Sequence, residues 1–84
     1  MRNGIDFFGF SVLHSQVQIT KLVGKNIRHY RHRLKISQET LAFRCKMGSD
    51  YIAKCERGEM NMTLENIAKM CKGLKIAPEK LFRT

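Results

Sequence analysis

A chain of 84 residues is long enough for one small domain and too short for two independent cores. Its 16 lysine and arginine residues and 7 aspartate and glutamate residues give a net charge of +9, and 43% of the residues are apolar. This apolar share favours a packed core over general disorder. The chain has no run of 18 apolar residues, which argues against a transmembrane helix. Residues 1–19 also lack the clean apolar stretch of a signal peptide.

The positive charge is concentrated in one part of the chain. Ten basic and three acidic residues lie between Lys21 and Arg57, which gives this segment a net charge of +7. Such a concentration in a small domain favours a polyanionic partner, and nucleic acid is the commonest. The alternative is a basic surface that serves only solubility.

Cysteine and histidine give no sign of a metal site. Cys45, Cys55 and Cys71 are widely spaced and form no C-x-x-C pair, so we expect buried thiols in a reducing cytoplasm. His29 and His32 lie three residues apart but lack matching ligands. The chain also has no Ser/His/Asp order and no glycine-rich phosphate loop. We therefore predict no metal, no cofactor and no enzymatic activity.

The amino-terminal residues differ from the rest. Phe7, Phe8 and Phe10 are interrupted by Gly4 and Gly9, and their pattern fits neither the helical nor the strand period well. We treat residues 1–18 as an extension of uncertain structure and residues 19–84 as the folded domain.

From about residue 20 the helical pattern is clear. Val23, Ile27 and Tyr30 form one apolar stripe. Ser37 is a good amino-terminal cap for a second helix over residues 38–45. A third helix is predicted over residues 49–57, and Gly58 ends it.

Two further helices are predicted after this point. Thr63 caps a fourth helix, over residues 64–74, that we expect to bury Leu64, Ile67 and Cys71. Pro78 opens a short fifth helix that ends at residues 81–82. No strong strand pattern follows residue 20, so the fold class is all-α. Its most informative unit is the helix, short turn and helix of residues 38–57.

Several runs in this part of the chain match one family. They are Ile36-Ser37-Gln38-Glu39, Leu41-Ala42, Tyr51-Ile52, Glu56-Arg57-Gly58-Glu59, residues 61–67 and residues 74–82. Over about residues 23–82 the chain resembles the helix-turn-helix family of phage repressors and Cro, also called the XRE family. The resemblance implies a five-helix DNA-binding domain. Within the family, the chain is similar to controller proteins of restriction–modification systems.

The third helix is the expected recognition helix. Ile52 and Cys55 face inward, and the outer face carries the predicted base-reading residues Ser49, Asp50, Ala53 and Lys54. A lysine donates hydrogen bonds to guanine, and an aspartate accepts one from the cytosine amino group. The alternative for Asp50 is that it only offsets the helix dipole.

The resemblance also implies phosphate contacts and a structural ion pair. The predicted phosphate-binding residues are Gln38, Tyr51, Asn61, Arg44, Lys46 and Lys25. Gln38 has the alternative of a solvated helix start, and Tyr51 that of a core residue. The family positions of Arg31 and Glu56 imply an ion pair that orients the recognition helix, with its value in geometry more than in stability.

The expected protein is a homodimeric, sequence-specific regulator that binds a pseudo-palindromic operator in double-stranded DNA and controls its own gene. The predicted dimer interface consists of Met62, Ile76, Leu81 and Phe82, which have the alternative of completing a monomer core.

A second class is an antitoxin or similar interaction module that binds a protein partner through Phe7, Phe8 and Phe10. Leu34 and Phe43 are apolar at positions that are polar in the family. They suggest either that the amino-terminal arm folds back over them or that the arm belongs to an interface.

Overall fold

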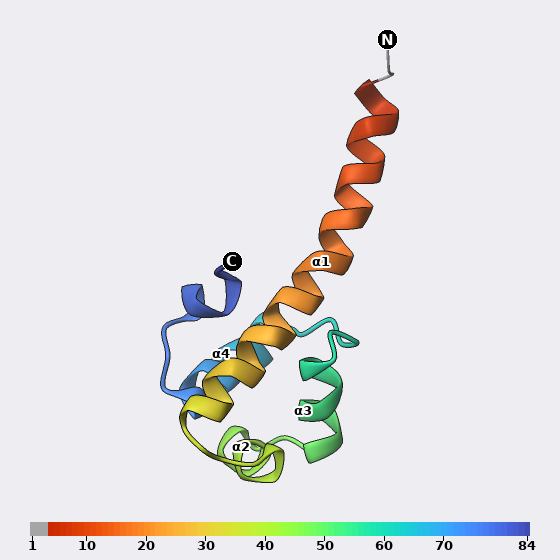
Figure 1. Ribbon diagram of the computed structural model, residues 1–84. Helices are drawn as coiled ribbons and strands as arrows, with labels where there is room; N and C mark the ends of the chain where they lie inside the picture. Colours follow the sequence, from red (N-terminus) through yellow and green to blue (C-terminus); the bar gives the residue numbers. More distant parts are fainter. Residues whose placement is uncertain (1–3) are drawn as a thin grey trace.

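The computed structural model describes the backbone of residues 4–84 and the side chains of residues 18–84. It contains α1 (Gly4–Arg33), α2 (Gln38–Cys45), α3 (Ser49–Glu56), α4 (Leu64–Leu74) and the 3-10 helix η1 (Pro78–Phe82) (Figure 1). The all-α class is confirmed, and residues 4–84 contain no strand. The fifth element was expected to be an α-helix and is a 3-10 helix instead. It spans only five residues, and Lys80 donates its backbone hydrogen bond three residues back, to Ala77, at 3.0 Å.

The first helix begins earlier than the sequence pattern indicated. α1 is continuous from Gly4 to Arg33 and runs through the predicted boundary between residues 18 and 19. The side chains of Phe7, Phe8 and Phe10 lie outside the described part of the structure. Figure 1 shows the helix projecting beyond the other elements.

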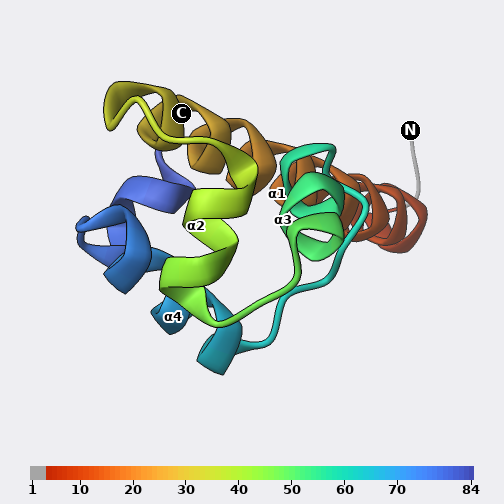
Figure 2. The same cartoon turned by 90° about the horizontal axis from the view of Figure 1, so that it is seen from below.

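The core lies where α1 crosses the remaining helices. Its fully buried side chains are Ile27, Leu41, Ile52, Met70, Leu74 and Leu81. Gly24 allows α1 to approach α3 closely, because a Cβ atom there would lie 2.2 Å from the backbone oxygen of Cys55. Figure 2 shows α2 and α3 packed side by side, with α1 extending away from them. The fold thus places the helix-turn-helix unit at the end of the molecule opposite the projecting helix.

The helix ends largely follow the predicted capping signals. The Ser37 hydroxyl accepts a hydrogen bond from the Thr40 amide at 3.0 Å, and Thr63 caps α4 in the same way through Asn66 at 3.1 Å. Gly58 adopts a positive φ of 76° just after α3, which ends at residue 56 and not at 57. These local bonds fix where α2, α3 and α4 begin or end.

The prediction that Leu64 is buried is wrong. Leu64 keeps the helical spacing of the inward face but is 83% exposed, because it is the first residue of α4 and lies beyond the packed region. Met70 is fully buried on the same helix, and Ile67 is half-buried. The core-facing surface of α4 therefore lies in its second half.

The two apolar residues at family-polar positions have different environments. Leu34 is partly buried against the core, so it needs no further cover. Phe43 is 85% exposed on α2, and no described residue covers it.

Within residues 4–84, no helix is both long and apolar enough to cross a membrane. The described residues also contain no cluster of three histidine, cysteine, aspartate or glutamate residues that could hold a metal ion. Cys45, Cys55 and Cys71 are free and buried.

Candidate nucleic-acid interface

The turn between α2 and α3 sets the angle of the recognition helix. Lys46 adopts a left-handed conformation, with φ of 58°, at the carboxyl end of α2, and its backbone amide bonds back to that helix. Gly48 precedes α3 without a side-chain cap. The buried Leu41 and Ile52 anchor the two helices in the core. The core-facing side of α3 is consequently fixed by packing, and its outer side remains open to solvent.

The predicted base-reading residues lie on this open surface. Asp50 and Lys54 are exposed, and Ser49 and Ala53 are half-buried. Three of the four, all except Lys54, line a hollow of about 270 Å³ between the start of α2 and the start of α3. Its lining comprises Ser37, Gln38, Glu39, Ser49, Asp50 and Ala53. The two helix starts therefore share one polar depression.

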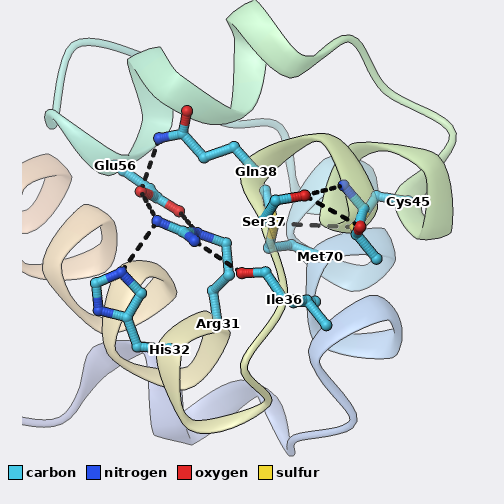
Figure 3. A network of polar contacts seen from close by, with 9 residues as sticks. Arg31, His32, Ile36, Ser37, Gln38, Cys45, Glu56 and Met70 are labelled. Atoms are coloured by element: carbon cyan, nitrogen blue, oxygen red, sulfur yellow. Dashed lines mark hydrogen bonds and ion pairs between the residues drawn. The ribbon is translucent and has the colours of Figure 1, made fainter.

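A polar network fastens α3 to α1 and α2 (Figure 3). Arg31 Nε donates to Glu56 Oε2 at 2.6 Å, and Arg31 Nη2 donates to Glu56 Oε1 at 3.1 Å. Arg31 Nη1 also donates to the backbone oxygen of Ile36 at 2.8 Å. Gln38 Nε2 donates to the same Glu56 Oε1 at 3.0 Å. We call Arg31, Gln38 and Glu56 the clamp; it brings together the ion pair and one of the predicted phosphate contacts.

The clamp is largely shielded from water. The side chains of Arg31 and Glu56 are only 10% and 4% exposed. Burial raises the pKa of the Glu56 carboxyl, but the hydrogen bonds from Arg31 and Gln38 outweigh it and lower this pKa below its ordinary value of 4.5. Glu56 therefore remains ionised at neutral pH, and its negative charge keeps both donors in fixed positions.

The remaining phosphate candidates are distributed around the helix-turn-helix unit. The exposed residues among them are Lys25, Arg44, Lys46 and Asn61. Arg44 also donates to the backbone oxygen of Gly73 at 3.2 Å, which fixes its side chain against α4. The Tyr51 hydroxyl accepts a hydrogen bond from Asn66 Nδ2 at 3.0 Å. Tyr51 is thus tied to α4 and is neither fully exposed nor a core residue.

Several charged residues near this surface were missed by the sequence reasoning. Arg28 lies one helical turn before Arg31 and acts electrostatically on Glu56. Arg57 and Glu59 form an exposed ion pair at 3.0 Å just beyond α3. The signal for Arg28 was its spacing of three residues from Arg31 on one helix. The contact between Arg57 and Glu59 depends on the sharp turn at Gly58 and has no such signal.

The predicted dimer residues separate into three environments. Met62 and Phe82 border one groove, and Ile76 borders a different hollow beside Leu34. Leu81 is 0% exposed, so its assignment to a dimer interface is corrected: it completes the core of its own chain. Phe82 is 45% exposed and has surface left for a partner.

Comparisons with known proteins identify the family. The model of a helix-turn-helix domain matches residues 22–82. The control protein C.BamHI of Bacillus amyloliquefaciens is 41% identical over 64 residues, which cover 75% of this chain and 79% of that protein. The control protein C.SmaI of Serratia marcescens is 34% identical over 77% of this chain and 77% of its own length.

A solved structure gives the same result. The restriction–modification controller protein C.AhdI of Aeromonas hydrophila aligns with a TM-score of 0.73 and 38% identity. The alignment covers 75% of this chain and 96% of that one. This family consists of DNA-binding transcription regulators and not of enzymes. The chain therefore belongs to the helix-turn-helix family, and its relatives there include restriction–modification controller proteins.

Proposed function

We propose that this protein is a sequence-specific regulator of transcription that binds double-stranded DNA as a homodimer in the cytoplasm. The observation that carries the proposal is the open polar face of α3, which the buried clamp holds at the end of a chain with a net charge of +9. A single α3 reads only a few base pairs. Two copies present two such helices to a pseudo-palindromic operator. Its relatives are controller proteins, which supports control of its own promoter.

The base-reading roles follow from the chemistry of the outer face. Lys54 donates to guanine O6 or N7, and Asp50 accepts from the cytosine amino group. Ser49 bonds either kind of edge, and the Ala53 methyl group meets a thymine methyl group. Asp50 and Lys54 lie one helical turn apart on α3, which matches neighbouring base pairs along the groove.

The phosphate contacts would flank this face. Gln38 gives one N–H of its amide to Glu56 and retains the other for a phosphate oxygen. The Tyr51 hydroxyl accepts from Asn66 and also has the buried Cys55 thiol as a hydrogen-bond partner, so a phosphate would have to compete with that thiol for the hydroxyl proton. Lys25, Arg44, Lys46 and Asn61 complete the proposed set. The cationic members supply attraction that is independent of sequence and weakens with salt.

The test compares DNA duplexes. The full chain is titrated against a duplex from upstream of its own gene and against a random duplex of equal length, at two salt concentrations. We expect a preference of about a thousandfold or more for the upstream duplex. Lys54→Ala and Asp50→Ala should each reduce that preference by about tenfold or more.

Lys69→Ala is the matched control. Lys69 is an exposed lysine on α4 that pairs with Glu65 at 3.7 Å, outside the proposed contact set. Its replacement should leave the preference unchanged. Equal, weak and salt-sensitive binding of both duplexes by the unmodified protein would contradict the proposed function.

A further inference from the structure

An apolar groove lies where α1 leaves the domain. It has a volume of about 130 Å³ and is formed by α1, α3 with the loop that follows it, α4 and η1. Its apolar lining includes Ile19, Val23, Met60, Met62, Ile67 and Phe82. No charged residue belongs to the lining among the described residues. The groove is therefore chemically unlike the DNA-facing hollow, which carries two carboxylates and no apolar side chain larger than Ala53.

The rim of the groove is exposed apolar surface. Ile19 is 49% exposed and Phe82 is 45% exposed. Ile19 also borders a second hollow, which is lined by Gln18, Leu22 and Thr84. The base of the projecting helix thus has apolar surface on two sides, which is the type of surface that marks a protein contact.

Charge identifies the occupant. The charged side chains of residues 1–20 are Arg2 and Asp6, which cancel. Residues 21–84 therefore carry the whole net charge of +9. DNA gains nothing from an uncharged apolar groove. Two copies of a chain with this net charge repel each other, and a segment without net charge approaches the other copy at the least electrostatic cost. A second copy of this chain is therefore the occupant that the charge distribution favours.

The amino-terminal half of α1 supplies a segment of suitable composition. The match to the helix-turn-helix domain begins only at residue 22, although α1 begins at Gly4. Seven of the thirteen residues 5–17 are apolar. A helix this apolar needs a partner surface to remove it from water. At 1.5 Å per residue, residues 4–19 span about 24 Å, which is long enough to cross a neighbouring domain's groove.

We infer that two copies dimerise by exchanging these helices: residues 4–19 of each α1 pack against the groove formed by Ile19, Met60, Met62 and Phe82 of the other copy. The contact is reciprocal, as a twofold symmetric interface requires. This inference rests on the homodimer of the proposed function and names the segment that makes it. It gives Phe7, Phe8 and Phe10 an acceptor surface within the same protein.

The experiment measures the dimer dissociation constant of the full chain by sedimentation equilibrium. An arm variant carries Phe7→Ser, Phe8→Ser and Phe10→Ser, and a groove variant carries Phe82→Glu. Each is expected to raise the dissociation constant about a hundredfold or more, because loss of an anchoring aromatic commonly weakens an interface tenfold or more. Phe43→Ser removes an exposed aromatic from α2, away from the groove, and should leave the dimer unchanged.

Mixing the two variants provides the decisive measurement. A heterodimer pairs the intact arm of the groove variant with the intact groove of the arm variant, so the mixture should dimerise at least about tenfold more tightly than either variant alone. Circular dichroism melting confirms that each variant is folded. A mixture that gains nothing, or an arm variant as dimeric as the unmodified chain, would overturn the exchange.

The same samples separate this inference from the proposed function. If the arm variant is dimeric and still prefers the upstream duplex, the helix exchange is refuted and the proposed function as a DNA-binding regulator stands. An unmodified chain that is monomeric overturns the exchange, whether it binds DNA or is found with another protein. An unmodified chain that is dimeric but shows no preference among duplexes refutes the regulator and leaves the exchange to be judged by the mixture.

Discussion

The two ends of the domain differ in chemistry: one is fixed by a buried ion pair and the other exposes an apolar groove. At the helix-turn-helix end, Arg31 and Glu56 form a buried pair that positions α3 through directed hydrogen bonds. At the other end, Ile19 and Phe82 present exposed apolar surface around an uncharged groove. Directed bonds suit a surface that must meet base edges in one geometry. Apolar contact tolerates small adjustments and suits association between copies.

The largest expected effect is on the helix-turn-helix end, where a substitution of Glu56 disrupts the clamp. Glu56→Ala leaves the Arg31 guanidinium buried without its counter-ion, which typically costs about 3–5 kcal/mol. Urea unfolding should show this loss, and preference for the upstream duplex should fall with it. The double variant Arg31→Met, Glu56→Leu should recover much of the stability without recovering the preference. Full stability in Glu56→Ala would contradict the role of the clamp.

A second change tests the junction between the ends. Gly24→Ala forces a Cβ atom to within 2.2 Å of the Cys55 backbone oxygen, so α1 and α3 must separate. Overpacking of this kind costs about 1–3 kcal/mol. Thermal unfolding measures the loss. Gly48→Ala is the control, because a Cβ atom there meets nothing within 4 Å. Equal effects of the two substitutions would be inconsistent with close packing at Gly24.

Acid should weaken the clamp before it affects the apolar end. The folded-state pKa of Glu56 lies below its ordinary value of 4.5, so the stabilisation is present above that value and is lost as pH falls through the folded pKa. The free energy of unfolding should therefore decline below about pH 4.5. In Glu56→Gln this decline should be shallower. Parallel curves for the two proteins would assign the acid sensitivity to other carboxylates.

A substitution of Asn26 tests the groove end of the domain separately from the helix-turn-helix end. Its Nδ2 donates to the backbone oxygens of Leu81 at 2.8 Å and Arg83 at 2.9 Å, which ties η1 to α1 beside the groove. Asn26→Ala should cost about 1–2 kcal/mol and weaken dimerisation measured by sedimentation. The monomer's contact with bases should be unchanged, as single half-site titrations would show. If Asn26→Ala weakened half-site binding and left dimerisation unchanged, Asn26 would support the DNA-binding face and not the groove.

The smallest effect separates stability from binding. Lys46 and Lys75 both end helices in the left-handed conformation, with φ of 58° and 60°. Glycine is favoured there, so Lys75→Gly and Lys46→Gly should each stabilise the fold by about 0.5 kcal/mol. Only Lys46→Gly should also reduce the salt dependence of DNA binding, by about one counterion. The same salt dependence in both variants would remove Lys46 from the phosphate contacts.

The predictable parts of the fold were those with local signals. Ser37 and Thr63 marked helix starts through hydroxyl caps, and Gly58 marked the end of the recognition helix, because these bonds join residues close in sequence. The burial of Leu64 was mispredicted because periodicity gives a direction around a helix and not the extent of its neighbours. The early start of α1 at Gly4 was missed because the phenylalanines of residues 7–10, interrupted by Gly9, follow neither the helical nor the strand period.

The same division applies to the candidate site. The pairing of Arg31 with Glu56 was anticipated from the resemblance, and the structure places them in contact. The bond from Gln38 to Glu56 joins residues 18 apart in sequence, and no spacing rule suggests it. The groove depends on four separate segments meeting, so it could emerge only from the assembled fold.

The continuity of α1 has a mechanical consequence. Arg31 and Ile19 lie on one uninterrupted helix, about 18 Å apart along its axis at 1.5 Å per residue. A helix resists both stretching and twisting. Where two copies meet through its amino-terminal half, the number of residues between Ile19 and Arg31 therefore fixes the distance and the rotation between the two recognition helices. One inserted residue would turn the whole arm by about 100° and would change which operator spacing the pair fits.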